Sequence, residues 1–132
     1  MFPTPSGLVA CLAASIPRTS ANLSTVMSRS LILASSSKIR LQLLQAAGLV
    51  VTPIAARIDE DSIRHSLEAE AATPRDIADA LADMKAAKLS DRHPDELVLG
   101  CDQVLDFKGT VFNKPETIDH ARGQLVALRG QT

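Results

Sequence analysis

Short apolar runs alternate with helically spaced apolar residues from Leu31 to the end of the chain, and this alternation constrains the fold most strongly. Leu31–Ala34 and Leu97–Cys101 are almost continuously apolar, which is typical of buried strands. After each run, apolar residues recur every three or four positions, as they do on one face of a helix. Alternating strands and helices in one chain predict an α/β fold.

Capping and turn residues predict where these elements begin and end. The expected strands are 31–34, 49–55 and 97 to about 107, and Lys108-Gly109 forms a turn. Thr73-Pro74 predicts a helix start, because threonine is a good N-cap and proline fits the first helical position. The apolar faces of the four expected helices are Ile39, Leu43, Leu44 and Ala47; Ile63, Leu67 and Ala71; Ile77, Leu81 and Met84; and Ile118, Ala121, Leu125 and Leu128.

Composition excludes several classes of protein. The 132 residues suit one domain, and 45% apolar with 22% charged residues can form a core. No apolar run approaches the roughly 18 residues that span a bilayer. A net charge of −1 and 2% aromatic residues argue against a partner that is a nucleic-acid polymer. Two cysteines and three histidines give neither a disulfide framework nor zinc spacing, so we expect a cytoplasmic protein.

Residues 1–30 differ from the rest, since they contain nine Ser/Thr, three Pro and no periodic apolar face. We expect a disordered extension here, followed by one domain over 31–132. A lipoprotein leader ending at Cys11, an organellar transit peptide and a true start at Met27 are alternatives. Residues 1–58 carry five basic groups and no acid, whereas 59–132 carry nine basic and fifteen acidic groups. This asymmetry suggests a basic site in the first half or a targeting arm.

The segment Ser35-Ser36-Ser37-Lys38-Ile39-Arg40 follows the first buried run. A helix start presents unpaired N–H groups and a positive dipole end. The Ser37 hydroxyl adds a donor and Arg40 adds a planar cation, which together suit a phosphate group. An ordinary serine-capped helix with a solvated Arg40 is the alternative.

Two sets of carboxylates are candidates for chemistry. Asp102 follows a buried-type strand, where a carboxylate must be paired, bind a metal or act as an acid or base. It could equally bond a neighbouring loop. Asp59-Glu60-Asp61 could hold Mg²⁺, which prefers oxygen ligands, or could form a solvated acidic loop.

Two lysines complete the candidate site. Lys85 falls at the margin of a helical apolar face and could reach inward to an anion, although it could also extend its ammonium to solvent. Lys114 precedes Pro115, which stiffens its turn, and could otherwise be a surface residue. Cys101 is expected to be a small buried side chain rather than a nucleophile. Cations and carboxylates in this combination suit a site for a triphosphate and a metal ion.

Six segments, in order, resemble motifs of one family. They are Ala34-Ser35-Ser36-Ser37-Lys38-Ile39-Arg40, Asp59-Glu60, Leu81 to Lys85-Ala86, Gly100-Cys101-Asp102-Gln103-Val104, Phe112-Asn113-Lys114-Pro115 and Leu128-Arg129-Gly130-Gln131-Thr132. The combination resembles the Maf family of septum-formation-type proteins, which are nucleoside triphosphate pyrophosphatases. Lys38 and Ile39 replace the proline and first arginine of its Ala-Ser-x-Ser-Pro-Arg-Arg turn.

The resemblance implies a Maf/ITPase-like mixed β-sheet with flanking helices, incomplete at the C-terminus, because family members continue for roughly 60–80 further residues. It implies hydrolysis of modified or surplus nucleoside triphosphates to a monophosphate and pyrophosphate. Asp102 would be the general base or a metal ligand, and Glu60 would bind Mg²⁺ or Mn²⁺. The residues implied to bind the substrate are Ser37, Arg40, Lys85 and Lys114, with Gln103 near the base.

Gln103 also bears on the substrate, because the Asp-Gln form resembles the subgroup that acts on 7-methyl-GTP rather than on dTTP and UTP. The partners implied are the nucleotide and a second copy of the chain in a homodimer, without a membrane. Two alternatives are a non-catalytic truncated relative that acts as an interaction protein in septation, and a simple nucleotide-binding module.

Overall fold

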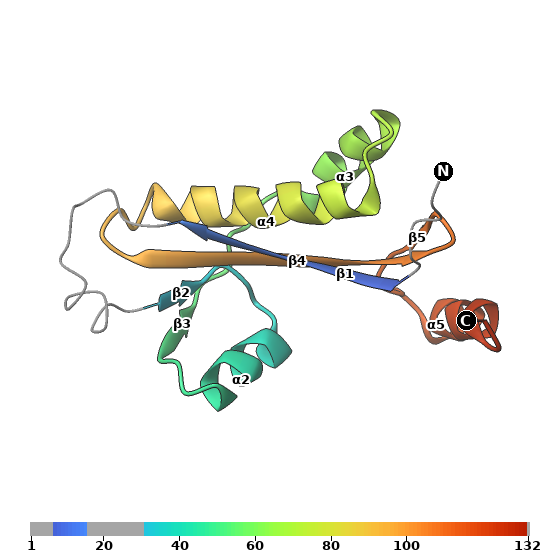
Figure 1. The fold of residues 1–132 in the computed structure, drawn as a ribbon, viewed down its shortest axis with the longest axis horizontal. Helices are drawn as coiled ribbons and strands as arrows, with labels where there is room; N and C mark the ends of the chain where they lie inside the picture. The colour runs from blue at the N-terminus through green and yellow to red at the C-terminus, as the bar shows by residue number, and fades with distance from the viewer. Residues whose placement is uncertain (1–6, 16–30, 132) are drawn as a thin grey trace.

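A computed structural model describes residues 7–15 and 31–131 of the chain. The described strands are β1 (Gly7–Ser15), β2 (Leu31–Leu33), β3 (Val51–Pro53), β4 (Leu97–Phe107) and β5 (Thr110–Phe112), and the helices are α2 (Lys38–Ala46), α3 (Glu60–Ala69), α4 (Pro74–Ser90) and α5 (Ile118–Leu128). Figure 1 shows α4 on one side of the sheet, α2 on the other and α5 at one end. The α/β class predicted from the alternating pattern is therefore confirmed.

The long strand β4 organises the sheet, whose order is β1-β4-β2-β3, with β5 also paired to β4. β2 runs parallel to both β4 and β3, whereas β1 and β5 run antiparallel to β4. The sheet is thus mixed, as expected. β2 pairs with the first three residues of β4, so its carboxyl end lies beside Leu99. The turn Ser35–Ser37, which follows β2, therefore lies near the next residues of β4, Cys101 and Asp102.

β1 corrects the expectation of disorder for residues 7–15. It forms a nine-residue ladder with β4, from Gly7 opposite Asp106 to Ser15 opposite Val98. The Ser/Thr/Pro content of the whole segment concealed a mainly apolar stretch, which pairs with the edge of β4 and places Ala13 in the core. Residues 1–6 and 16–30, on which the prediction of a start at Met27 falls, lie outside the described residues.

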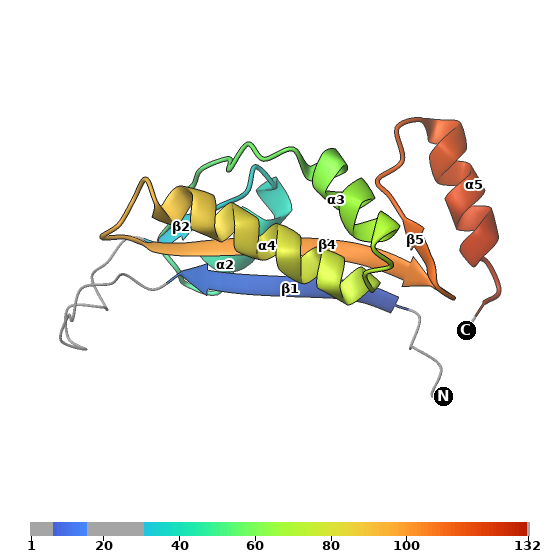
Figure 2. The same ribbon diagram turned by 90° about the horizontal axis from the view of Figure 1, so that it is seen from above.

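The packing of α4 on β4 depends on Gly100. A Cβ at this position would lie 2.1 Å from the carbonyl oxygen of Ala82 and 2.9 Å from the Cβ of Ala86. The helix backbone therefore lies almost directly on the strand, an approach that small residues on both elements permit. Figure 2 shows α4 running along β4 and β1. This contact sets the position of Lys85, which lies between the two alanines.

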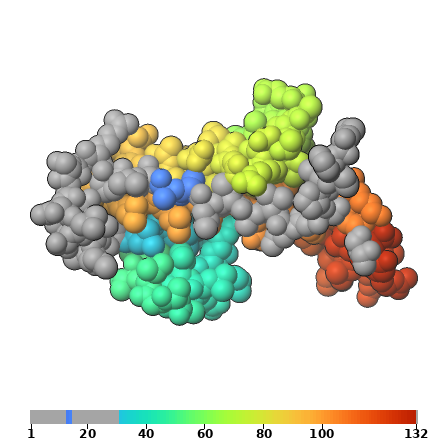
Figure 3. Space-filling view, in the orientation of Figure 1, coloured from blue at the N-terminus to red at the C-terminus, as the bar shows by residue number. Residues whose placement is uncertain are grey.

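The apolar face predicted for α4 is buried at Ile77 and Leu81, which are at most 1% exposed, but not at Met84, which is 43% exposed. α3 adds Ile63 and Leu67 to the same core cluster. Helices α2 and α5 form as predicted, but neither contains a buried residue, so their apolar faces are largely exposed. Leu43 of α2 is 66% exposed and Ile118 of α5 is 81% exposed. Figure 3 shows α2 projecting from one side of the molecule and α5 at one end.

The predicted helix start at Thr73 is confirmed, as is the serine cap at Ser37, and Thr117 is the N-cap of α5. The Lys108-Gly109 turn is also confirmed, and both residues have positive φ, at 51° and 81°. Strand β5, which follows this turn, was not expected. No helix in the described part of the chain combines the length and apolar character that a bilayer span requires.

Candidate active site

A buried ion pair between Lys85 and Asp102 lies at the centre of the candidate site. Lys85 Nζ is 2.8 Å from Asp102 Oδ1, and both side chains are only 7% exposed. The same ammonium lies 3.0 Å from Oε2 of Glu60, whose side chain is 43% exposed. Three elements that are separate in the sequence thus meet here: α4 supplies Lys85, β4 supplies Asp102 and the first turn of α3 supplies Glu60.

Asp102 keeps one oxygen available. Its Oδ2 atom is buried and has no hydrogen-bond partner among the described residues. A buried carboxylate oxygen without a partner is unfavourable unless a water, a metal ion or a substrate group occupies the space beside it. The lysine fixes Oδ1, so the geometry leaves Oδ2 as the acceptor that can take a proton or bind a cation.

The carboxylates also allow a test of the expected metal ion. Among residues 7–15 and 31–131, no group of three or more His, Cys, Asp and Glu side chains could hold a metal. Glu60 and Asp102 supply two carboxylates, and the unpartnered Oδ2 is one oxygen ligand of the kind that Mg²⁺ prefers. Mg²⁺ is commonly bound by one or two carboxylates with water and substrate phosphates. The residues present fit such a shared site rather than a closed protein cage.

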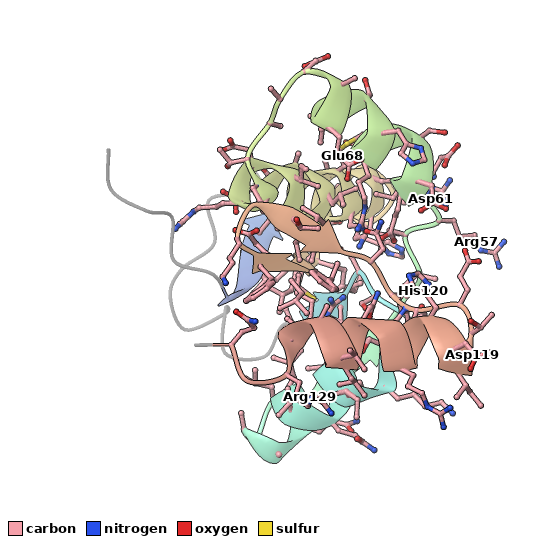
Figure 4. The ribbon with its side chains drawn as sticks, turned by 90° about the vertical axis from the view of Figure 1, so that its right-hand side faces the viewer. Arg57, Asp61, Glu68, Asp119, His120 and Arg129 are labelled. Carbon is pink, nitrogen blue, oxygen red and sulfur yellow. The ribbon has the colours of Figure 1, made fainter. Side chains whose placement is uncertain are left out.

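The three residues of the predicted acidic cluster, Asp59, Glu60 and Asp61, have different surroundings. Glu60 contacts Lys85. Asp59 caps α3, accepting hydrogen bonds from the backbone nitrogen and the hydroxyl of Ser62 at 3.2 and 2.8 Å. These two hydrogen bonds lower the pKa of Asp59. Asp61 is exposed on α3 (Figure 4), so only Glu60 belongs to the site.

Arg40 connects the turn Ser35–Ser37 to β4. The Nη1 atom of Arg40 donates to the backbone carbonyl of Cys101 at 3.1 Å and to Ser35 Oγ at 3.3 Å. Ser37 accepts a hydrogen bond from the backbone nitrogen of Arg40 at 3.4 Å, as an N-cap does. The guanidinium is therefore held beside the residue that precedes Asp102, at the start of α2. Sequence reasoning did not single out Ser35, although its buried hydroxyl also accepts from the backbone nitrogen of Ser37 at 3.2 Å.

Cys101 is a free, buried cysteine, as expected. Burial raises the pKa of its thiol, and the nearby charges of Arg40 and Lys85 offset this only in part. The thiol is therefore protonated at neutral pH, which is the form that packs as a small side chain and is a poor nucleophile.

Two predicted residues lie apart from the ion pair. Gln103 is exposed and follows Asp102 on a strand, where consecutive side chains point to opposite faces of the sheet. It therefore lies on the face opposite Lys85. Lys114 is exposed in the connection between β5 and α5 and is not among the contacts of Asp102. Neither Gln103 nor Lys114 therefore belongs to the buried cluster of Lys85, Asp102 and Glu60.

Removing the charge of Lys85 is expected to destabilise the fold. Lys85→Met leaves the buried carboxylate of Asp102 without its cation, which costs about 3–5 kcal/mol of unfolding free energy. The double variant Lys85→Met/Asp102→Leu removes both buried charges and should recover most of that loss. Urea unfolding of both variants measures the difference. A loss below about 1 kcal/mol in the single variant would show that the pair is solvated.

Comparison with known proteins adds independent findings. A family model described as Maf-like protein matches residues 30–132. A protein of Ruegeria sp. (strain TM1040) called nucleoside triphosphate pyrophosphatase is 53% identical over 105 residues, which are 80% of this chain and 53% of the relative. A protein of Ruegeria pomeroyi with the same name is 54% identical over 101 residues, covering 76% of this chain and 51% of the relative.

A third relative, from Mesorhizobium japonicum, is called 7-methyl-GTP pyrophosphatase and is 42% identical over 106 residues. These residues are 80% of this chain and 53% of the relative. The chain thus spans about half the length of the curated relatives that it matches. β1 lies before the segment that the family model matches.

Proposed function

Because this chain belongs to the Maf family, we propose that its site hydrolyses nucleoside triphosphates to a nucleoside monophosphate and pyrophosphate. The observation that carries the proposal is the Asp102 carboxylate, with one oxygen held by Lys85 and the other buried without a partner among the described residues. Relatives named nucleoside triphosphate pyrophosphatase support the assignment of the reaction.

In the proposed reaction, Asp102 Oδ2 accepts a proton from a water molecule. The water oxygen forms a bond to the α-phosphorus, and the bond from that phosphorus to the bridging oxygen breaks. Pyrophosphate leaves with the electron pair of that bond. General base catalysis of this kind contributes about 10²–10⁴-fold to a rate. The hydrogen bond from Lys85 fixes the carboxylate so that Oδ2 is the oxygen presented to water.

Two cations, Arg40 and Lys114, would bind the phosphates. Arg40, beside the N-terminus of α2, would bind phosphate oxygens together with the Ser37 hydroxyl, because a helix start adds N–H groups to the same place. Lys114 would bind them from the β5–α5 connection. Such groups favour the transition state where they offset the charge that grows on the leaving pyrophosphate.

Glu60 and Asp102 are the residues that would hold a divalent cation, Mg²⁺ or Mn²⁺. When bound, this ion would neutralise phosphate charge and polarise the phosphoryl oxygens. Lys85 already bridges the two carboxylates. It would keep them close together and limit the repulsion between them before the nucleotide arrives.

We propose 7-methyl-GTP as the preferred substrate, with Gln103 contributing to the choice of base. Glutamine offers a donor and an acceptor, which a purine edge can pair with. Gln103 is exposed and therefore accessible to a ligand, and it lies on the sheet face opposite Asp102, away from the attacking water. The Mesorhizobium japonicum relative supports this choice by its name, whereas the Ruegeria relatives have a general name.

Steady-state kinetics decides the substrate. We expect kcat/KM to be at least about tenfold higher for 7-methyl-GTP than for dTTP or UTP, since a site built on hydrogen bonds rejects bases that leave its groups unpaired. Gln103→Thr should reduce this ratio. Both the 132-residue chain and a chimera, which adds the part of the Ruegeria pomeroyi relative that the chain does not span, are assayed. A preference for dTTP or UTP would overturn the choice of base and leave the reaction class standing.

A second candidate is a protein that binds nucleotides without turnover and acts through protein partners in septation. Two of the predicted substrate-binding residues, Gln103 and Lys114, lie apart from the buried ion pair, and this placement is the observation that favours it. Calorimetric binding of a triphosphate without release of pyrophosphate, in chain and chimera alike, would support it. For either function we propose that the chain forms a homodimer and is located in the cytoplasm. The free, buried thiol of Cys101 supports the reducing compartment.

A further inference from the structure

A hydrogen bond outside the buried ion pair connects α3 with the β5–α5 connection. Arg64 Nη1 donates to Asn113 Oδ1 at 2.6 Å, which is short for a bond from a charged donor. Arg64 lies one helical turn after Glu60 on α3, and Asn113 directly precedes Lys114. Figure 2 shows the chain between β5 and α5 passing beside α3. The bond therefore joins the helix that carries Glu60 to the segment that carries Lys114.

Asn113 is held from a second side. Gln124 of α5 donates through Nε2 to the backbone carbonyl of Asn113 at 2.8 Å. Side chain and backbone of this one residue are thus fixed by different helices, although the residue is exposed and lies outside any helix or strand. Pro115 restricts the chain just after Lys114. With both neighbours of Lys114 constrained, the direction in which its side chain leaves the backbone is constrained too.

The Nε atom of Arg64 is buried and has no hydrogen-bond partner among the described residues. Such an atom is unfavourable for stability, because it loses its hydration and gains no bond in return. Methionine has a similar length and would avoid this cost. The arginine is thus not explained by stability alone, and its one short bond, to Asn113, is the feature that a methionine would lose.

We infer that Arg64 is a positioning residue that acts through Asn113 to hold Lys114 at the phosphate-binding side of the site. This role rests on the proposed function, in which Lys114 binds the triphosphate. Arg64 itself touches neither the reacting atoms nor the nucleotide. It connects the helix that carries Glu60, the proposed metal ligand, to the segment that carries Lys114, so that the two residues keep a fixed spacing when the nucleotide binds.

The test combines kinetics with NMR relaxation of the backbone. Arg64→Met should lower kcat/KM for the triphosphate about 10- to 100-fold, mostly through KM, because misplacing a binding group by about 1 Å has effects of that size. In a Lys114→Met background the same substitution should have no further effect. Arg75→Met is the matched control, since Arg75 is 81% exposed on α4 and pairs only with Asp79 among the described residues. Additive effects of the Arg64 and Lys114 substitutions would overturn the inference.

Backbone ¹⁵N relaxation separates this inference from the proposed function. The amide order parameters of residues 113, 114, 116 and 117 should fall from about 0.85, the value of a rigid backbone, to about 0.6 or less in Arg64→Met, because the bond that holds the Asn113 side chain has been lost. Asn113→Ala should give the same fall. If the order parameters do not change, the inference fails whatever the enzyme does. If they fall but the unmodified protein releases no pyrophosphate, Arg64 still orders this segment, while the proposed function and the catalytic role of Lys114 fail together.

Discussion

Asp102→Asn is expected to lower the turnover of the triphosphate by about 10²–10⁴-fold, the contribution of a general base. Asparagine has nearly the same shape, and its amide oxygen can still accept the hydrogen bond from Lys85. It has no carboxylate oxygen to take the proton from water. Thermal unfolding by circular dichroism should show that the variant folds, since Glu60 still pairs with the ammonium. Pyrophosphate release measures the loss of activity.

Asp106→Asn is the matched control. Asp106 lies on β4 four residues after Asp102 and is also buried, at 5% exposure. Its carboxylate accepts a hydrogen bond from the backbone nitrogen of Gly109 at 3.0 Å, in the turn before β5, and belongs to no part of the candidate site. We expect this variant to keep its activity. If Asp102→Asn kept more than half of the activity, Asp102 would not be the base.

Gly100→Ala is expected to destabilise the fold by about 3 kcal/mol, at the upper end of the usual cost of overpacking. The new methyl group would lie 2.1 Å from the backbone carbonyl of Ala82, and a helix backbone cannot move aside as a flexible side chain can. α4 must therefore shift away from β4, which moves Lys85 relative to Asp102. Urea unfolding should show the loss of stability, and any variant that folds should also lose activity.

Gly123→Ala provides the comparison for this prediction. Gly123 lies within α5, and a Cβ there would meet nothing within 4 Å. Alanine is favoured over glycine inside a helix by about 0.5–1 kcal/mol, so stability should be unchanged or slightly higher. Equal stabilities for the two variants would show that the close approach at Gly100 does not determine the packing of α4.

The elements with strong local patterns could be predicted from the sequence. The N-cap at Thr73 and the apolar spacing of Ile77 and Leu81 predict α4, and the structure confirms both the cap and the buried face. The apolar run that ends at Cys101 likewise predicts β4, and with it the buried position of Asp102. These features depend on neighbours in the sequence, which is why periodicity and capping reveal them.

Features that depend on distant partners could not be predicted in this way. β1 becomes a strand because β4 offers an edge about 90 residues later, as the pairing of Cys11 with Asp102 illustrates. The exposed apolar faces of α2 and α5 match the helical period as well as α4 does, but the described residues provide nothing to cover them. The link between Arg64 and Asn113 joins residues 49 positions apart, and no spacing pattern along the chain connects them.

The candidate site could be predicted in its residue types rather than in its arrangement. Glu60, Lys85 and Asp102 each stand out in the sequence, but only the structure shows that one ammonium holds both carboxylates. The Asp59-Glu60-Asp61 cluster is uniform in sequence, although helix geometry sends its three side chains to a cap, the site and solvent. Spacing along the chain cannot decide which member of such a run points inward.

Hydrolysis in ¹⁸O-labelled water tests the central claim most directly, with the chain and the chimera as enzymes and ³¹P NMR spectroscopy as the readout. The account predicts one labelled oxygen in the nucleoside monophosphate and none in the pyrophosphate, at equal yields of the two products. Asp102→Asn should form both products at least about 10²-fold more slowly. Label in the pyrophosphate, or release of orthophosphate and a nucleoside diphosphate, would contradict the proposed attack of water at the α-phosphorus.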